Sequence, residues 1–85
     1  MAQEMGAQEL GARELDVRGL HCPLPILRTR RQLDHMAEGE ELIVLVTDPA
    51  SVIDFKHFCN TTAHELVEHT QAEGVFTYRI RRGAA

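Results

Sequence analysis

Residues 14–27, ELDVRGLHCPLPIL, join the end of one predicted element to the start of the next. Leu15 and Val17 alternate with polar residues, and this period of two predicts a half-buried strand. Gly19 ends the alternation. The stretch therefore predicts a strand that runs into a helix through a short loop containing Cys22.

A helix is predicted from Pro23 to about Glu38. Proline is tolerated in the first turn of a helix, where its missing N–H would have no intrahelical partner, so Pro23 and Pro25 indicate a helix start. Gly39 is a plausible stop. One face of this helix is apolar, with Ile26, Leu33 and Ala37 in line and Leu27 and Met36 beside them.

The rest of the chain predicts a strand, a helix and two further strands. Residues 42–46 form a short apolar run typical of a strand that is central in its sheet or covered on both faces. Asp48 and Pro49 are expected as N-cap and first position of a second helix. Strands are then expected at 64–71 and 75–81, joined at hairpin length.

The element order is therefore β-α-β-α-β-β, which fits a single sheet with both helices on one face. Residues 13–82 make one domain, and residues 1–12, rich in Ala, Gln, Glu and Gly, are expected to be a flexible tail.

Composition limits the function classes. With 85 residues the chain has room for one small domain and little room for an enclosed pocket. It has no apolar run long enough to span a bilayer and no secretory signal, so we expect a cytoplasmic protein. Two cysteines in such a chain suggest free thiols in a reducing compartment. A net charge of -4 argues against non-specific binding to nucleic-acid phosphates.

Cys22 is the leading candidate for chemistry. At a helix N-terminus the free amides and the helix dipole favour a thiolate, so we expect a lowered pKa. His21 and Arg18 would add to this effect when cationic, and Pro23 and Pro25 would present the sulfur rigidly. The alternative is that Cys22 is an ordinary buried small side chain.

The remaining candidates carry weaker signals. Cys59 lies on the apolar stripe of the second predicted helix and is expected in the core rather than as a second thiol of the site. The five histidines show no metal-ligand spacing with the cysteines, so no metal site is expected. Arg28, Arg30 and Arg31 fit a solvated helix face; the alternative, chiefly for Arg28 and Arg31, is a basic patch that docks an acidic partner.

The sequence resembles the TusA/SirA-like sulfur carriers, whose signature is Cys-Pro-X-Pro. The resemblance extends over roughly residues 14–82 and consists of matching landmarks in order: Leu15-Asp16, Gly19-Leu20, Cys22-Pro23-Leu24-Pro25, Gly39-Glu40, Thr47-Asp48-Pro49-Ala50, Asp54, Phe58-Cys59 and His64-Glu65-Leu66. One departure is Ala63, where many members have glycine; a position requiring positive φ would resist that change.

This resemblance implies a two-layer α/β sandwich, with two helices on one face of a four-stranded mixed sheet. It also implies that Cys22 carries sulfur as a persulfide, with no other cofactor. The implied partners are a cysteine desulfurase or another sulfurtransferase as donor and a sulfur-relay protein as acceptor. Transfer-RNA thiolation, molybdenum-cofactor assembly and sulfur oxidation are possible destinations, and a monomer would suffice.

Two other function classes fit the sequence less well. A thiol oxidoreductase would usually have a second cysteine close to the first, and a cysteine hydrolase would need a base and an oxyanion hole. A small RNA-binding or regulatory α/β module is the other alternative, which the acidic charge and the lack of interleaved aromatic residues disfavour.

Overall fold

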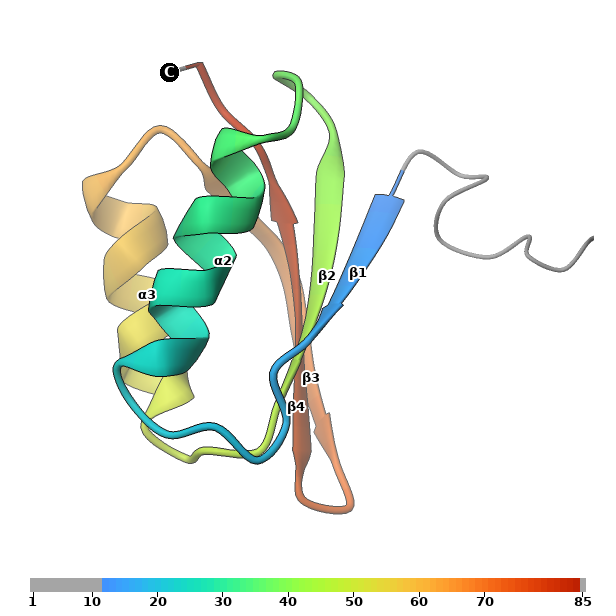
Figure 1. Cartoon of the computed structure of the whole chain (residues 1–85), viewed down its shortest axis with the longest axis vertical. Helices are drawn as coiled ribbons and strands as arrows, with labels where there is room; N and C mark the ends of the chain where they lie inside the picture. The colour runs from blue at the N-terminus through green and yellow to red at the C-terminus, as the bar shows by residue number, and fades with distance from the viewer. Residues whose placement is uncertain (1–11, 85) are drawn as a thin grey trace, which may run out of the picture.

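The computed structural model describes residues 12–84 and shows a two-layer α/β sandwich (Figure 1). The elements follow the predicted order, and their bounds are β1 Ala12–Asp16, α2 Leu24–Asp34, β2 Glu41–Val46, α3 Ser51–Thr61, β3 Glu65–Ala72 and β4 Val75–Arg81. Ala12, which we assigned to the tail, is the first residue of β1. The rest of the predicted tail lies outside the described residues.

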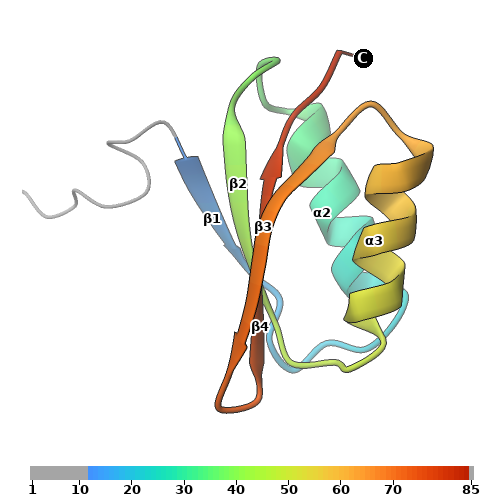
Figure 2. The ribbon, with the colours of Figure 1, turned by 180° about the vertical axis from the view of Figure 1, so that it is seen from behind.

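The sheet has the strand order β1-β2-β4-β3 and is mixed, as predicted. β1 pairs with β2 in parallel, with Asp16 opposite Leu45, whereas β4 is antiparallel to both β2 and β3. Both helices cover one face of the sheet, and the other face is left open (Figure 2). Because α2 and α3 each follow one of two strands that run in the same direction, both helices begin at the same end of the molecule (Figure 1).

The core lies between the helices and the central strands. In β2, Leu42, Val44 and Val46 are fully buried, whereas the residues between them are half-buried on the open face. The 42–46 run is thus central in its sheet but covered by helices on one face only. On α3, Phe55 stacks on Tyr78 of β4 with ring centroids 4.4 Å apart.

The predicted apolar face of α2 is confirmed in part: Leu33 and Met36 are buried and Ile26 packs against the core. The buried residues of the helix are Pro25, Thr29 and Leu33, and the Thr29 hydroxyl donates to the Pro25 carbonyl at 2.8 Å. Leu27, which we placed beside the apolar face, is 52% exposed. The helix also ends four residues earlier than expected, at Asp34 instead of Glu38.

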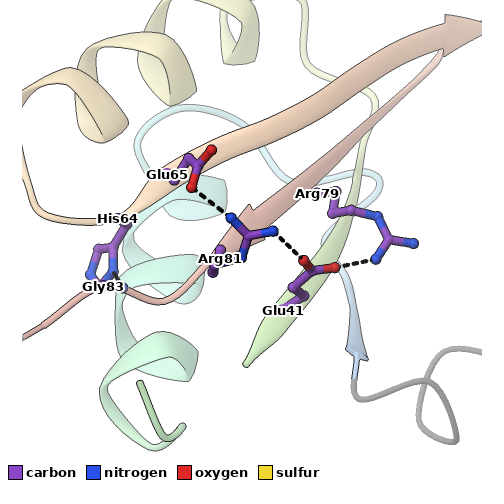
Figure 3. A network of polar contacts seen from close by, with 6 residues as sticks. All are labelled: Glu41, His64, Glu65, Arg79, Arg81 and Gly83. Atoms are coloured by element: carbon purple, nitrogen blue, oxygen red, sulfur yellow. Dashed lines mark hydrogen bonds and ion pairs between the residues drawn. The ribbon is translucent and has the colours of Figure 1, made fainter. Parts of the chain in front are cut away.

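The end of the chain packs closely on the segment between α3 and β3. A Cβ at Gly83 would lie 2.0 Å from the Ala63 carbonyl oxygen, so only glycine fits there. The Gly83 amide also donates to Nδ1 of His64 at 3.0 Å (Figure 3). Ala63 itself is not among the described non-glycine residues with positive φ, a group that contains only Glu73. Its replacement of glycine therefore requires no strained backbone.

A network of ion pairs links three strands at one end of the sheet (Figure 3). Glu41 accepts hydrogen bonds from Arg79 and from Arg81, and Arg81 also pairs with Glu65 at 2.7 Å. The hydrogen bond from Arg79 is the main reason that the pKa of Glu41 is lowered, and Arg81 adds to the effect although partial burial opposes it. The carboxylate of Glu41 is therefore charged at lower pH in the folded than in the unfolded chain.

We expect Gly83→Ala to lower the free energy of unfolding by about 1–3 kcal/mol, because the methyl group must displace the Ala63 backbone. Urea denaturation followed by circular dichroism measures this. Ala84→Ser, at the exposed neighbouring position, is the matched control and should change stability by less than about 0.5 kcal/mol. Equal stability of Gly83→Ala and wild type would contradict the close approach.

The Glu41 network should contribute to stability at neutral pH and not in acid. Because the folded pKa is below the unfolded value of about 4.3, the contribution is complete above that value and is lost as pH falls through the folded pKa. Melting temperatures measured between about pH 6 and pH 2 should therefore fall less steeply for Glu41→Gln than for wild type. Glu38→Gln, at an exposed position, should follow the wild-type curve.

Candidate functional site

Two loops meet at the end of the molecule where both helices begin. One loop, residues 17–23, leaves β1, and the other, residues 47–50, leaves β2 (Figure 1). The Gly19 amide donates to the Thr47 hydroxyl at 2.9 Å, and the Cys22 amide donates to Oδ2 of Asp48 at 2.7 Å. Gly19 has a φ of 85°, which a glycine adopts without strain and which turns the chain from β1 toward Cys22.

Asp48 organises this junction and is not the N-cap that we predicted. α3 begins at Ser51 with Ala50 as N-cap, two residues later than expected. Oδ1 of Asp48 accepts the Ala50 amide at 3.1 Å while Oδ2 holds Cys22. The pKa of Asp48 is lowered, first by the Cys22 amide, then by the Ala50 amide and, more weakly, by the charge of His21. Asp48 is therefore a carboxylate that joins the two loops.

The N-terminus of α2 lies within one residue of the expectation. Pro23 is the N-cap, so Cys22 directly precedes it, and the Cys22–Pro23 peptide bond is cis. Neither Pro23 nor Pro25 has an N–H, and the Leu24 amide donates to the His21 carbonyl at 2.8 Å. The first turn therefore offers few free donors to an anion at Cys22.

The Cys22 thiol is exposed, as predicted, but its pKa is raised rather than lowered. The main cause is the interaction of the thiol with the carboxylate of Asp54, followed by partial desolvation and by the negative charges of Asp54 and Asp48. Carboxylates close to a thiol disfavour its ionised form. The first turn of α2 has few free amides to oppose this effect, because Pro23 and Pro25 lack an N–H.

Cys22 lies at the mouth of an open groove of about 470 Å³ between α2 and α3. The groove combines apolar walls with a few polar side chains, and its lining comprises Cys22, Pro23, Ile26, Arg30, Ile53, Asp54, His57, Phe58 and Thr61. Arg30 lies over the Phe58 ring, 5.4 Å from its centroid. The sulfur is thus open to a second molecule on one side and backed by protein on the other.

The structure brings only some of the predicted supporting residues to the thiol. Arg18 forms a two-pronged ion pair with Asp16, with both N–O distances at 2.8 Å, and is held away from a role at Cys22. The pKa of Asp16 falls to about 2, chiefly through that pair. Arg28 and Arg31 are exposed on α2 and do not line the groove. His21 precedes Cys22 in the loop, and it contributes to the lowered pKa of Asp48.

Cys59 is half-buried and packs against the core, in agreement with its predicted role. Burial raises the pKa of its thiol to about 11. Within residues 12–84, no three His, Cys, Asp or Glu side chains gather as metal ligands. No helix in the described part of the chain is long and apolar enough to cross a membrane.

Asp54 is the site residue that the sequence analysis missed. An acidic residue in the first turn of a helix has a capping explanation of its own, so its sequence position alone does not point to the thiol. Its place beside Cys22 in the groove depends on the packing of α3 beside α2. Its only sequence signal was its place among the landmarks of the family resemblance.

Comparison with known proteins identifies the family. The family model described as sulfurtransferase TusA matches residues 13–82. The sulfur carrier protein TusA of Allochromatium vinosum is 46% identical over 64 residues, covering 75% of this chain and 84% of its own length. A protein of Neisseria meningitidis serogroup B with a provisional sulfur-carrier name is 46% identical over 65 residues, covering 76% of this chain and 88% of its own.

A solved structure supports the fold. The crystal structure of a SirA-like protein from Desulfitobacterium hafniense superposes with a TM-score of 0.73, covering 85% of this chain and 99% of that one. Sequence identity between the two is 24%, so this similarity concerns the fold alone.

The two thiols should differ strongly in reactivity. We expect iodoacetamide to modify Cys22 well before Cys59, with a pH midpoint for Cys22 above the value of about 8.5 for an ordinary cysteine. Alkylation rates between pH 6 and 10, followed by mass spectrometry in Cys59→Ser, measure the midpoint. A midpoint below that of a model peptide thiol would show that the helix dipole dominates after all.

Proposed function

Since the chain belongs to the TusA family of sulfurtransferases, we propose that it carries sulfur as a persulfide on Cys22. The observation that carries the proposal is the placement of Cys22, which is exposed at the mouth of an open groove with its amide anchored to Asp48. The anchor holds the backbone amide of the residue that bears the sulfur. A fixed and accessible sulfur suits repeated exchange with other proteins.

The exchange needs only a nucleophilic sulfur and a partner. The Cys22 sulfur attacks the terminal sulfur of a donor persulfide, and the donor cysteine leaves. In the reverse sense, an acceptor thiolate attacks the terminal sulfur held on Cys22. The donor in this proposal is a cysteine desulfurase or another sulfurtransferase, and the acceptor is a downstream relay protein. The chemistry uses no cofactor besides the bound sulfur.

Exposed apolar side chains support the docking of such partners beside Cys22. Leu24 and Leu27 on α2 and Val52 and Ile53 on α3 are between 40% and 75% exposed. Ile53, the most exposed of the four, lines the groove that holds Cys22, and exposed apolar surface at such a site is typical of protein–protein contacts. Arg28 and Arg31 remain the predicted contacts for an acidic partner surface, on the exposed side of α2.

The proposal places the carrier in the cytoplasm, where a reducing environment keeps both thiols free. Delivery could serve transfer-RNA thiolation, molybdenum-cofactor assembly or sulfur oxidation. In each case the acceptor is a protein, because the net charge of -4 opposes direct and stable binding to nucleic acid. Docking to successive partners requires no more than a monomer.

Incubation of the reduced protein with a cysteine desulfurase and cysteine should add one sulfur atom, removable by reductant. Intact-mass measurement detects the gain. Cys22→Ser should gain nothing, whereas Cys59→Ser should behave as wild type, because its thiol is half-buried with a high pKa.

Two outcomes would contradict the proposal in different ways. Sulfur found on Cys59 would mean that the carrier site is wrong. No gain from the desulfurase or from a second sulfur donor, with Cys22 shown to be free by alkylation, would overturn the carrier function. Salt-dependent RNA binding would then favour the alternative, an RNA-binding module without sulfur transfer.

A further inference from the structure

Asp54 has an unusual relation to the sulfur that the proposed function uses. It lies in the first turn of α3, half-buried, and its carboxylate is the main cause of the raised pKa of the Cys22 thiol. Both groups line the same groove, with Pro23, Ile26 and Ile53 as apolar neighbours. The proton that must leave Cys22 for sulfur exchange therefore lies in a groove whose lining contains one carboxylate, that of Asp54.

The other groups near the thiol are less suited to take this proton. Both oxygens of Asp48 already accept backbone amides, one from Cys22 and one from Ala50. His57 and Arg30 line the groove but do not act on the thiol as Asp54 does. His21 precedes Cys22 in the loop and acts on Asp48. Asp54 lines the groove together with Cys22, and no backbone amide of residues 12–84 donates to its carboxylate.

A neutral thiol makes such an acceptor necessary. An ordinary cysteine is only about 3% thiolate at pH 7, and the carboxylates around Cys22 lower that fraction further. Waiting for a preformed thiolate would therefore be slow. A thiolate of higher pKa is, however, the stronger nucleophile, so an arrangement that removes the proton during the attack gains reactivity.

On the basis of the proposed carrier function, we propose that Asp54 is the proton acceptor for Cys22 during sulfur exchange. As the Cys22 sulfur forms a bond to the terminal sulfur of the donor persulfide, Asp54 takes the thiol proton. The donor S–S bond breaks with its electron pair on the donor cysteine, and Asp54 passes the proton to that sulfur. A donor persulfide anion and the Cys22 thiol become a donor thiol and a Cys22 persulfide anion, with no external oxidant or reductant.

The decisive variant is Asp54→Asn, which keeps the shape and removes the base. With glutathione persulfide, a small donor that requires no protein docking, we expect sulfur uptake at pH 7 to slow by about 10²-fold. Alkylation of Cys22 by iodoacetamide should instead become several-fold faster, because the negative charge that opposes ionisation is gone. Rates of uptake and alkylation, followed by intact mass, should thus move in opposite directions.

The pH profile separates this role from a structural one. In Asp54→Asn, uptake must wait for a preformed thiolate and should rise about tenfold from pH 7 to pH 8, whereas wild type should change much less. Asp54→Glu should recover a substantial part of the uptake. Asp34→Asn, an equal loss of charge at the exposed C-terminal end of α2, should leave both rates unchanged. Circular dichroism melts establish that each variant is folded.

Three results would overturn the inference. If uptake and alkylation both accelerate in Asp54→Asn, the carboxylate only disfavours ionisation of the Cys22 thiol and does not assist the attack. If His57→Gln loses uptake and Asp54→Asn does not, the histidine is the acceptor. If Asp54→Asn keeps the wild-type uptake rate and pH profile, no side-chain acceptor at this position is used. In each of these cases the wild type still acquires sulfur on Cys22. Such a result would overturn the role of Asp54 and leave the carrier function in place.

Discussion

The parallel pairing of β1 with β2 is the constraint on which the site depends. Parallel neighbours leave the sheet at the same edge, so the loops that follow Asp16 and Val46 must lie side by side. The chain uses this proximity in the hydrogen bond from the Cys22 amide to Asp48. The same pairing directs α2 and α3 the same way along the sheet, so that Asp54 in the first turn of α3 lines the same groove as the thiol that precedes α2.

Two opposing electrostatic effects meet at Cys22, and the structure shows which is stronger. The start of a helix favours an anion through its free amides and its dipole. Here the two prolines remove amides and the Leu24 amide is already bonded, so little of that effect is left. Two carboxylates, those of Asp54 and Asp48, then raise the pKa of the thiol. The result is a thiol that is accessible but neutral, which differs from the activated cysteines of many thiol enzymes.

Local patterns in the sequence predicted the elements but not the contacts between them. The alternation in Val75–Arg81 gave both bounds of β4 correctly, because a half-buried strand has a period that a single segment displays. Element ends were less accurate where one residue could serve two purposes. Asp48 has the identity of an N-cap, yet it bonds the Cys22 amide across the loops, a partner that only the sheet pairing supplies. Arg18 likewise pairs with Asp16, two residues before it in the chain, and not with Cys22 as we predicted.

The edge strand β3 bears on how the molecule behaves when many copies are present. Most of its residues are exposed, so its outer side offers backbone donors and acceptors to any other strand. A bulge between Leu66 and Glu68 breaks the regular spacing of these groups, and Glu65 and Glu68 place acidic side chains along the strand. Interrupted spacing and repeated like charge both oppose edge-to-edge addition of identical chains. The β3 edge of the sheet is therefore less able to add strands from other copies of the chain, the step by which exposed edge strands form fibres.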